Sequence, residues 1–223
     1  MTVTRSGQKH AAPQCTGVIM AGGNATRFSG SQKGLLPVAG RRMIDRVADA
    51  LSPSCDQLLI IANHPSAREW LPGVKVRPDV YEGAAGLGGI HAALARSGTS
   101  VIIVAWDMPF VPASLIRSLR DAGADADAVL PASSSRHGLE PLCAFYSQAC
   151  LPPIEDALAS GARMPIAFHD NVRLRVLSQA EVSRHGDPEV IFMNVNTSDD
   201  LLRAEEIAAL KGDARPLDDD LKQ

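Results

Sequence analysis

Short apolar runs alternate along the chain with segments of mixed polarity. Apolar runs bounded by polar or turn residues predict buried strands, and apolar positions three or four residues apart predict helices. In the first half the predicted strands are residues 16–20, 57–62, 74–77 and 100–105, and the predicted helices are residues 43–51, 66–70, 89–96 and 113–122. Residues 128–131 begin the second half, in which residues 142–146, 173–177 and 190–194 are predicted strands and residues 151–160 and 198–210 are predicted helices. This alternation predicts one α/β domain with a mostly parallel sheet over residues 15–211, between a disordered tail at 1–14 and a flexible tail at 212–223.

The first predicted strand runs directly into paired glycines, Gly22 and Gly23, which are followed by Arg27 and Lys33. A glycine has no Cβ to keep the backbone away from a phosphate group. Backbone N–H groups in such a turn, especially one that leads into a helix, attract anions. The arginine can fork around phosphate oxygens and the lysine offers a mobile point charge. The segment therefore predicts a site that holds a polyphosphate.

Two better-known nucleotide motifs do not fit these residues. The dinucleotide fingerprint requires G-x-G-x-x-G, whereas Gly22 and Gly23 are adjacent. The P-loop requires G-K-[ST], whereas Lys33 follows Gln32 and precedes Gly34. For the glycine pair alone, a plain turn with two solvated cations nearby is the structural alternative.

A carboxylate appears directly after the apolar strand predicted at residues 100–105, at Asp107. In open α/β sheets, ligands bind at the carboxyl ends of the strands. Transfer between phosphates needs a divalent cation to neutralise oxygens, and a carboxylate on a rigid strand is a suitable magnesium ligand. We therefore predict that Asp107 binds Mg²⁺, with a helix-cap or loop role as the alternative.

Composition and charge narrow the possible functions. The chain has 223 residues, of which 45% are hydrophobic and 21% charged, enough for one substantial core. A formal net charge of −3 gives no electrostatic footprint for nucleic acid, and no apolar run approaches the roughly 20 residues that span a bilayer. Four cysteines without a C-x-x-C pair indicate buried free thiols, and six histidines without paired ligand spacing argue against zinc. We expect a cytoplasmic protein with no nucleic-acid or membrane partner.

Two amides precede the last predicted helix. Asn194 and Asn196 lie two residues apart, so in an extended segment both would point to the same side. Thr197 or Ser198 can cap the helix that follows. Capping alone explains the hydroxyls, but two amides on one face suit a polar ligand.

Three of these strings are similar to motifs of the nucleotidyltransferases related to molybdenum cofactor guanylyltransferase. Residues 20–33 resemble L-A-G-G-x-x-x-R-x-G-x-x-K, with Met20 in place of the usual leucine and a different spacing between Arg27 and Lys33. The string that begins at Trp106 resembles C-D-x-P-[FY], with tryptophan where cysteine or alanine is frequent. Residues 194–201 are similar to N-V-N-T-P-E-D-L. The resemblance covers residues 16–210 and implies a single-domain, Rossmann-like three-layer α/β/α fold of the nucleotide-diphospho-sugar transferase type.

The resemblance also implies a role for particular residues. The implied nucleotide-binding residues are Met20, Ala21, Gly22, Gly23, Lys33, Asn63, Asp79, Gly88 and Asp107. The implied catalytic residues are Arg27, Lys33 and Asp107, and the implied acceptor-binding residues are Arg163, Asn194 and Asn196. Turn or loop roles for Asn63 and Asp79 are equally open, and an arginine after a helix, such as Arg163, can instead serve the helix dipole.

The activity that this resemblance implies is transfer of GMP from GTP to the terminal phosphate of molybdenum-bearing molybdopterin, with Mg²⁺ as cofactor and pyrophosphate as the second product. Because the nucleophile is already an anion, positioning and charge neutralisation suffice without a strong general base. The alternatives are a cytidylyltransferase that uses CTP, since a phosphate grip does not report the base, and a non-catalytic nucleotide-binding or cofactor-carrier protein. Transient contact with cofactor-supplying proteins or molybdoenzyme apoproteins is compatible with a labile product.

Overall fold

The computed structural model describes residues 14–22, 32–81 and 85–212. The predicted tails fall outside the described residues, apart from their inner ends at Gln14 and Gly212. Gly23 and Arg27 of the predicted phosphate grip also lie outside the described residues.

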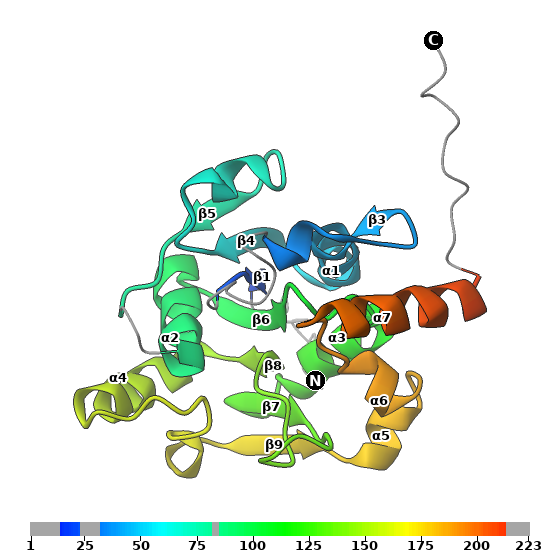
Figure 1. Cartoon of the computed structure of the whole chain (residues 1–223). Coiled ribbons are helices and arrows are strands. Elements are labelled where there is room, and N and C mark those ends of the chain that lie inside the picture. Colours follow the sequence, from blue (N-terminus) through cyan, green and yellow to red (C-terminus); the bar gives the residue numbers. More distant parts are fainter. Residues whose placement is uncertain (1–13, 23–31, 82–84, 213–223) are drawn as a thin grey trace, which may run out of the picture.

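A seven-stranded sheet in the order β5-β4-β1-β6-β8-β7-β9 forms the centre of the molecule (Figure 1). Its strands are β1 (Cys15–Met20), β4 (Gln57–Ile61), β5 (Lys75–Arg77), β6 (Ser100–Ala105), β7 (Ala128–Pro131), β8 (Cys143–Tyr146) and β9 (Leu174–Leu177). All neighbouring pairs are parallel except those of β8, which runs antiparallel to both β6 and β7. The prediction of a mostly parallel sheet is confirmed.

Helices cover both faces of this sheet. They are α1 (Met43–Leu51), α2 (Ala85–Ser97), α3 (Ala113–Ala122), α4 (Leu151–Ala159), α5 (Gln179–Ser183), α6 (Pro188–Ile191) and α7 (Ser198–Leu210). Figure 1 shows α2 and α4 on one side and α1 and α3 on the other, which gives the predicted three-layer α/β/α arrangement. None of the helices in the described segments is long and apolar enough to cross a membrane.

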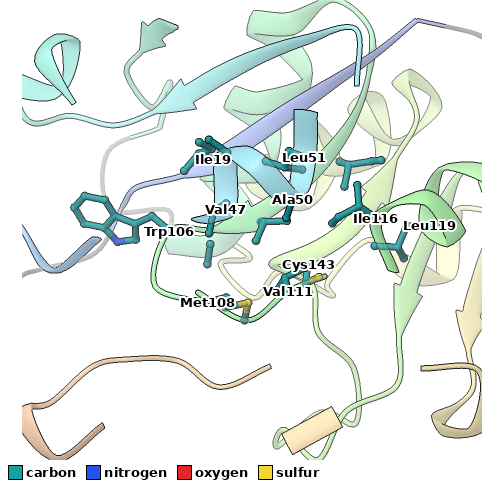
Figure 2. Packing of buried hydrophobic residues seen from close by; sticks show 14 of the residues in the cluster. Ile19, Val47, Ala50, Leu51, Trp106, Met108, Val111, Ile116, Leu119 and Cys143 are labelled. Carbon is teal, nitrogen blue, oxygen red and sulfur yellow. The ribbon is translucent and has the colours of Figure 1, made fainter. Parts of the chain in front are cut away.

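The core divides into two clusters because successive side chains of a strand point to opposite faces. On the central strand β6, Ile102 belongs to the cluster that α1 and α3 cover, and Ile103 belongs to the cluster that α2 and α4 cover. Figure 2 shows Val47 and Leu51 of α1 in the first cluster, four residues apart and therefore on one helix face. A sheet buried on both faces needs the near-continuous apolar strands that the sequence contains.

A third apolar cluster joins the C-terminal helix α7 to a short hairpin that the sequence pattern does not predict. Strands β2 (Pro37–Val38) and β3 (Arg41–Arg42) are joined by two residues with positive φ, Ala39 at 50° and Gly40 at 73°. The Ala39 N–H donates to a carboxylate oxygen of Glu205 in α7 at 2.8 Å. This cluster holds the segment before α7 close to the residues that precede the hairpin.

The strand predicted at residues 190–194 is wrong. Val190 lies in helix α6, and residues 192–197 are irregular. Asp187 caps this helix by accepting from the Glu189 N–H at 3.0 Å, and Pro188 occupies the first helical position. These two start signals outweigh the strand preference of a valine and an isoleucine.

Most other predicted elements are present with small shifts. Helices α1 and α3 and strands β6 and β7 span the predicted residues. The helix predicted at residues 66–70 is a 3-10 helix, η4 (Pro65–Glu69), and α2 begins at Ala85 rather than at residue 89. The four cysteines are free, as expected, and all except Cys55 are buried.

Replacing Ile102 by alanine tests the role of β6 as the centre of the core. Ile102 is fully buried, so Ile102→Ala should lower the free energy of unfolding by about 2–5 kcal/mol, measured by urea denaturation. Leu202→Ala is the control, because that side chain is 65% exposed and its loss should change stability by less than about 0.5 kcal/mol. Equal effects in the two variants would contradict the assignment.

Candidate active site

The carboxyl ends of four parallel strands bring the predicted nucleotide-binding residues to one edge of the sheet. The ladder continues one residue beyond these strands, because the Ala21 N–H donates to the Ile61 carbonyl at 2.9 Å and the Trp106 N–H to the Met20 carbonyl at 3.1 Å. Beyond this pairing lie Gly22 after β1 and three polar residues, Asn63 after β4, Asp79 after β5 and Asp107 after β6. The rigid edge therefore fixes where the three polar side chains start.

Lys33 connects the two halves of the chain at this edge. It opens a 3-10 turn, η2 (Lys33–Leu35), and its ammonium forms an ion pair with the Asp107 carboxylate. The same ammonium donates to the Asn196 side-chain oxygen at 2.6 Å. The Lys33 and Asp107 side chains are only 17% and 9% exposed, so their attraction is less screened than that of a surface pair.

The backbone also ties the C-terminal segment to the end of β6. The Val195 N–H donates to the Asp107 carbonyl at 2.9 Å, and the Val195 side chain is fully buried in the third cluster. The Asp200 carboxylate accepts from the N–H groups of both Asn196 and Thr197, and the Asp200 N–H donates to Thr197 Oγ1. The capping of α7 therefore fixes the loop that presents Asn196 to Lys33.

Asn63 and Asp79 form a second polar pair on the neighbouring strands. The Asp79 N–H donates to the Asn63 side-chain oxygen at 2.9 Å, and the Asn63 amide donates back to Asp79 Oδ2 at 3.3 Å. Asp79 Oδ1 is buried and has no hydrogen-bond partner among the described residues. Burial raises the pKa of Asp79 above its usual value, and the Asn63 hydrogen bond partly offsets this. Asp79 thus keeps one carboxylate oxygen without a hydrogen-bond partner among the described residues.

The glycine-rich start of α2 packs against Met20 and lies close to Asp79. A Cβ at Gly89 would lie 2.7 Å from Met20 Sδ and 3.9 Å from Asp79 Oδ1. The absence of a Cβ lets the helix lie against the end of the Met20 side chain, which would have to move if a side chain were added at Gly89. Gly88, one of the predicted nucleotide-binding residues, is buried in the same first turns of α2.

Two predicted acceptor-binding residues are not drawn into the Lys33 cluster. The Asn194 amide donates to the Phe192 carbonyl at 3.2 Å, and its segment is not the strand that was expected. Arg163 is exposed beyond α4, where its guanidinium donates to the Ala162 carbonyl at 2.8 Å. In the turn before it, Gly161 has a φ of 89°.

Sequence reasoning assigned no role to Glu140, which also lies at this edge. It precedes β8, whose antiparallel direction puts the start of that strand beside the end of β6, and the Ala105 N–H donates to the Leu142 carbonyl at 2.9 Å. The pKa of Glu140 is raised to about 7: burial raises it most, a hydrogen bond from the Leu142 N–H partly offsets this, and the charge of Asp107 adds to the rise. No local pattern signals this residue, because its position depends on the direction of β8.

The residues at this edge fit a magnesium ion that is held together with a substrate. Among the described residues, no three His, Cys, Asp or Glu side chains are grouped to hold a metal ion. Mg²⁺ in phosphate-transfer sites binds one or two carboxylates and completes its shell with waters and substrate phosphates. Asp107, at the end of a rigid strand with Glu140 near it, matches that donor set.

Comparison with known proteins gives the family. A model described as the MobA-like NTP transferase domain matches residues 17–172. The chain belongs to this family. Its match begins at β1 and extends through α4, so it contains Lys33, Asp107 and Glu140 but not Asn196. The predictions of a nucleotidyltransferase and of its family are confirmed.

Relatives extend the likeness over most of the chain. A protein of Desulfosudis oleivorans named molybdenum cofactor guanylyltransferase is 37% identical over 88% of this chain and 96% of its own length. A Pelotomaculum thermopropionicum protein named probable molybdenum cofactor guanylyltransferase is 37% identical over 87% of this chain and 94% of its own.

A solved structure supports the fold independently. Molybdopterin-guanine dinucleotide biosynthesis protein A from Archaeoglobus fulgidus has a TM-score of 0.72 and 28% identity, and the match covers 87% of this chain and 99% of that one. This confirms the expected nucleotidyltransferase fold.

The titration of Glu140 gives a test of the site's electrostatics. Its pKa of about 7 in the folded chain lies above the value of about 4.3 for an unfolded glutamate, so the folded state binds this proton more tightly. The resulting stabilisation is complete below about pH 4.3 and is lost as the pH rises through about 7. Glu140→Gln cannot ionise, so the stability of the wild type relative to this variant should fall across that range, measured by urea unfolding without metal or nucleotide.

Glu69→Gln is the matched control for this experiment, because Glu69 is an exposed glutamate in η4. Its stability relative to the wild type should not change over the same pH range. Parallel pH profiles for the wild type and Glu140→Gln would show that Glu140 is not held in the environment described.

Proposed function

We propose that this nucleotidyltransferase transfers GMP from GTP to the terminal phosphate of molybdopterin that carries molybdenum, forming the guanine dinucleotide cofactor and pyrophosphate. The observation that carries the proposal is the Lys33 ammonium held between Asp107, at the end of the central strand, and Asn196, in the C-terminal segment. The names of the two relatives that are 37% identical supply the choice of guanine and of the molybdenum cofactor, and the name of the protein in the Archaeoglobus fulgidus structure supplies molybdopterin.

In this proposal the nucleotide lies along the ends of β1, β4, β5 and β6. Met20, Ala21, Gly22 and Gly23 line its phosphates with backbone, and Arg27 joins Lys33 as a second cation. The free oxygen of Asp79, oriented by Asn63, accepts a hydrogen bond from the nucleoside, and Gly88 lets the α2 backbone approach.

The acceptor binds on the side of the C-terminal segment. Asn196 already contacts Lys33, and Asn194 lies two residues before it on the same loop. Arg163 lies on an exposed turn and contacts a charged group of the acceptor that lies away from the reacting phosphate. The acceptor phosphate is thereby directed at the α-phosphorus that Lys33 and Arg27 hold.

The reaction exchanges one phosphorus–oxygen bond for another. An oxygen of the acceptor phosphate forms a bond to the α-phosphorus, and the bond from that phosphorus to the bridging β-oxygen breaks, so pyrophosphate takes the electron pair. No proton must be removed from the nucleophile. Lys33 and Arg27 counter the negative charge that grows on the phosphate oxygens, and Asn196 fixes the lysine while they do so.

Asp107 would hold Mg²⁺, which when bound supplies charge neutralisation on the triphosphate. In the structure one Asp107 oxygen instead faces the Lys33 ammonium. We propose that the triphosphate oxygens replace Asp107 as the counter-charge of this ammonium while Asn196 still holds the lysine in place, which frees the carboxylate.

Removing either charge tests the assignment. Lys33→Met and Asp107→Asn should each lower kcat/KM for GTP by about 100- to 1,000-fold, as the loss of one preorganised charge-stabilising group does. The measurement is pyrophosphate release from GTP, Mg²⁺ and molybdenum-bearing molybdopterin. Asp107→Asn keeps the side-chain shape, so its fold should be retained, which thermal unfolding checks.

Lys75→Met is the matched control, because Lys75 is an exposed lysine on β5 away from Asp107. Its turnover should equal that of the wild type. Wild-type turnover in either Lys33→Met or Asp107→Asn would remove that residue from the proposed site.

A further inference from the structure

The turn that carries Lys33 rests on an aromatic ring. Gly34 is buried, and a Cβ placed on it would lie 2.3 Å from Cε3 and 2.4 Å from Cδ2 of Trp106. No real Cβ tolerates such distances, so the backbone at Gly34 lies directly against the indole. Leu36 closes the turn, since its N–H donates to the Lys33 carbonyl at 3.0 Å.

This contact and the ion pair form two adjacent points of attachment. Lys33 and Gly34 are neighbours on the turn, and Trp106 and Asp107 are neighbours at the end of β6. The lysine contacts the aspartate while the glycine contacts the tryptophan. Two points fix both the position and the orientation of the turn, whereas the ion pair alone would leave the flexible lysine free to swing.

The indole itself is held rigidly. Trp106 is 4% exposed and stacks on Trp70, with ring centroids 5.0 Å apart and planes at 29°. The Trp70 indole donates to Ser66 Oγ at 3.2 Å, which ties the stack to η4. Figure 2 shows Trp106 at one end of the first core cluster, which also contains Ile19 of β1.

A third tether holds the other side of the turn to the same support. The Gln32 amide nitrogen lies 2.8 Å from His64 Nε2 and donates to Ser66 Oγ at 3.4 Å. The His64 and Trp70 rings are 5.8 Å apart. Gln32 therefore contacts η4, and Lys33 and Gly34 contact the residues that follow β6. The stack of Trp70 on Trp106 joins these two supports.

Burial of the Trp106 indole N–H lowers the stability of the fold. The Nε1–H is buried and has no hydrogen-bond partner within the described part of the chain. A buried donor without a partner lowers stability. What the ring supplies in return is a flat surface beneath Gly34 and a stacking partner for Trp70.

We infer that Trp106 is a positioning residue that acts through Gly34: its indole presets the Lys33 ammonium at Asp107 and Asn196 before any nucleotide binds. The part of this inference that concerns turnover rests on the proposed function. The position of the lysine in the free protein does not depend on it.

Gly34→Ala is the central test, because the added methyl group must push the turn off the indole. We expect kcat/KM for GTP to fall by about 10- to 100-fold, the loss that displacement of a positioning group by about 1 Å produces. The kcat should fall along with any rise in KM, because a displaced ammonium no longer meets the charge that develops in the transition state.

Gly123→Ala is the matched control for simple overpacking. A Cβ at Gly123 would lie 2.5 Å from Cε1 of Phe145, which belongs to the same core cluster as Trp106 but lies away from the turn. Both alanine variants should lower the thermal unfolding midpoint, but only Gly34→Ala should lower kcat/KM. Equal kinetic losses in the two variants would overturn the inference.

A double-mutant cycle tests whether the two residues act through their contact with each other. Trp106→Leu removes the fused rings and makes room for a methyl group at position 34. The loss in the double variant Gly34→Ala, Trp106→Leu should be smaller than the product of the two single losses, because residues in contact are not additive. Independent, multiplying losses would contradict a contact between them.

A chemical modification experiment reports whether the Lys33 ammonium is held in place, and it requires no turnover. An amine-reactive acylating reagent is added, and peptide mass spectrometry follows the rate at which Lys33 is modified. In the wild type the paired ammonium should react more slowly than the exposed Lys75, and in Gly34→Ala its rate should rise toward that of Lys75. An unchanged Lys33 rate overturns the inference. Slow Lys33 modification in a protein that does not turn over GTP would refute the proposed function and leave the positioning intact.

Discussion

A single lysine ammonium, shared between a carboxylate and an amide, is the interaction on which the arrangement of the site depends. Lys33, Asp107 and Asn196 come from segments far apart in the chain, and each is positioned by a different device: a turn on an indole, the end of a buried strand, and a capped loop before α7. A charge this poorly exposed is stable only when paired. The chain must therefore bring all three elements together to satisfy it.

The direction of the strands decides which other groups share the edge. Parallel pairing of β5, β4, β1 and β6 gathers Asp79 and Asp107 at carboxyl ends, and the antiparallel β8 adds Glu140 from the start of a strand. Burial raises the pKa of both Asp79 and Glu140, so the edge resists accumulating negative charge in the free protein. An anionic ligand can bind at such an edge only when the lysine and a divalent cation neutralise the negative charge of the ligand and the carboxylates.

Much of the fold could be predicted from the sequence, because burial on both faces makes the strands apolar along their length and places the first polar residue at their ends. That logic located Asp107, and the helices α1 and α3 and the strand β6 span the predicted residues. The strand predicted at 190–194 was wrong because the start signals Asp187 and Pro188 prevail locally. Glu140 and the contact of Gly34 with Trp106 were not predicted, since strand direction and contacts between distant segments leave no local pattern.

The fold and its family make the protein a nucleotidyltransferase, and the identity of the transferred nucleotide is the central claim that an experiment must decide. The most direct measurement is mass spectrometry of the product formed from molybdenum-bearing molybdopterin and Mg²⁺ with GTP, CTP, ATP and UTP present together at equal concentration. The expected result is the guanine dinucleotide with one pyrophosphate released per product. A cytosine dinucleotide, or no dinucleotide at all from a folded protein, would contradict it.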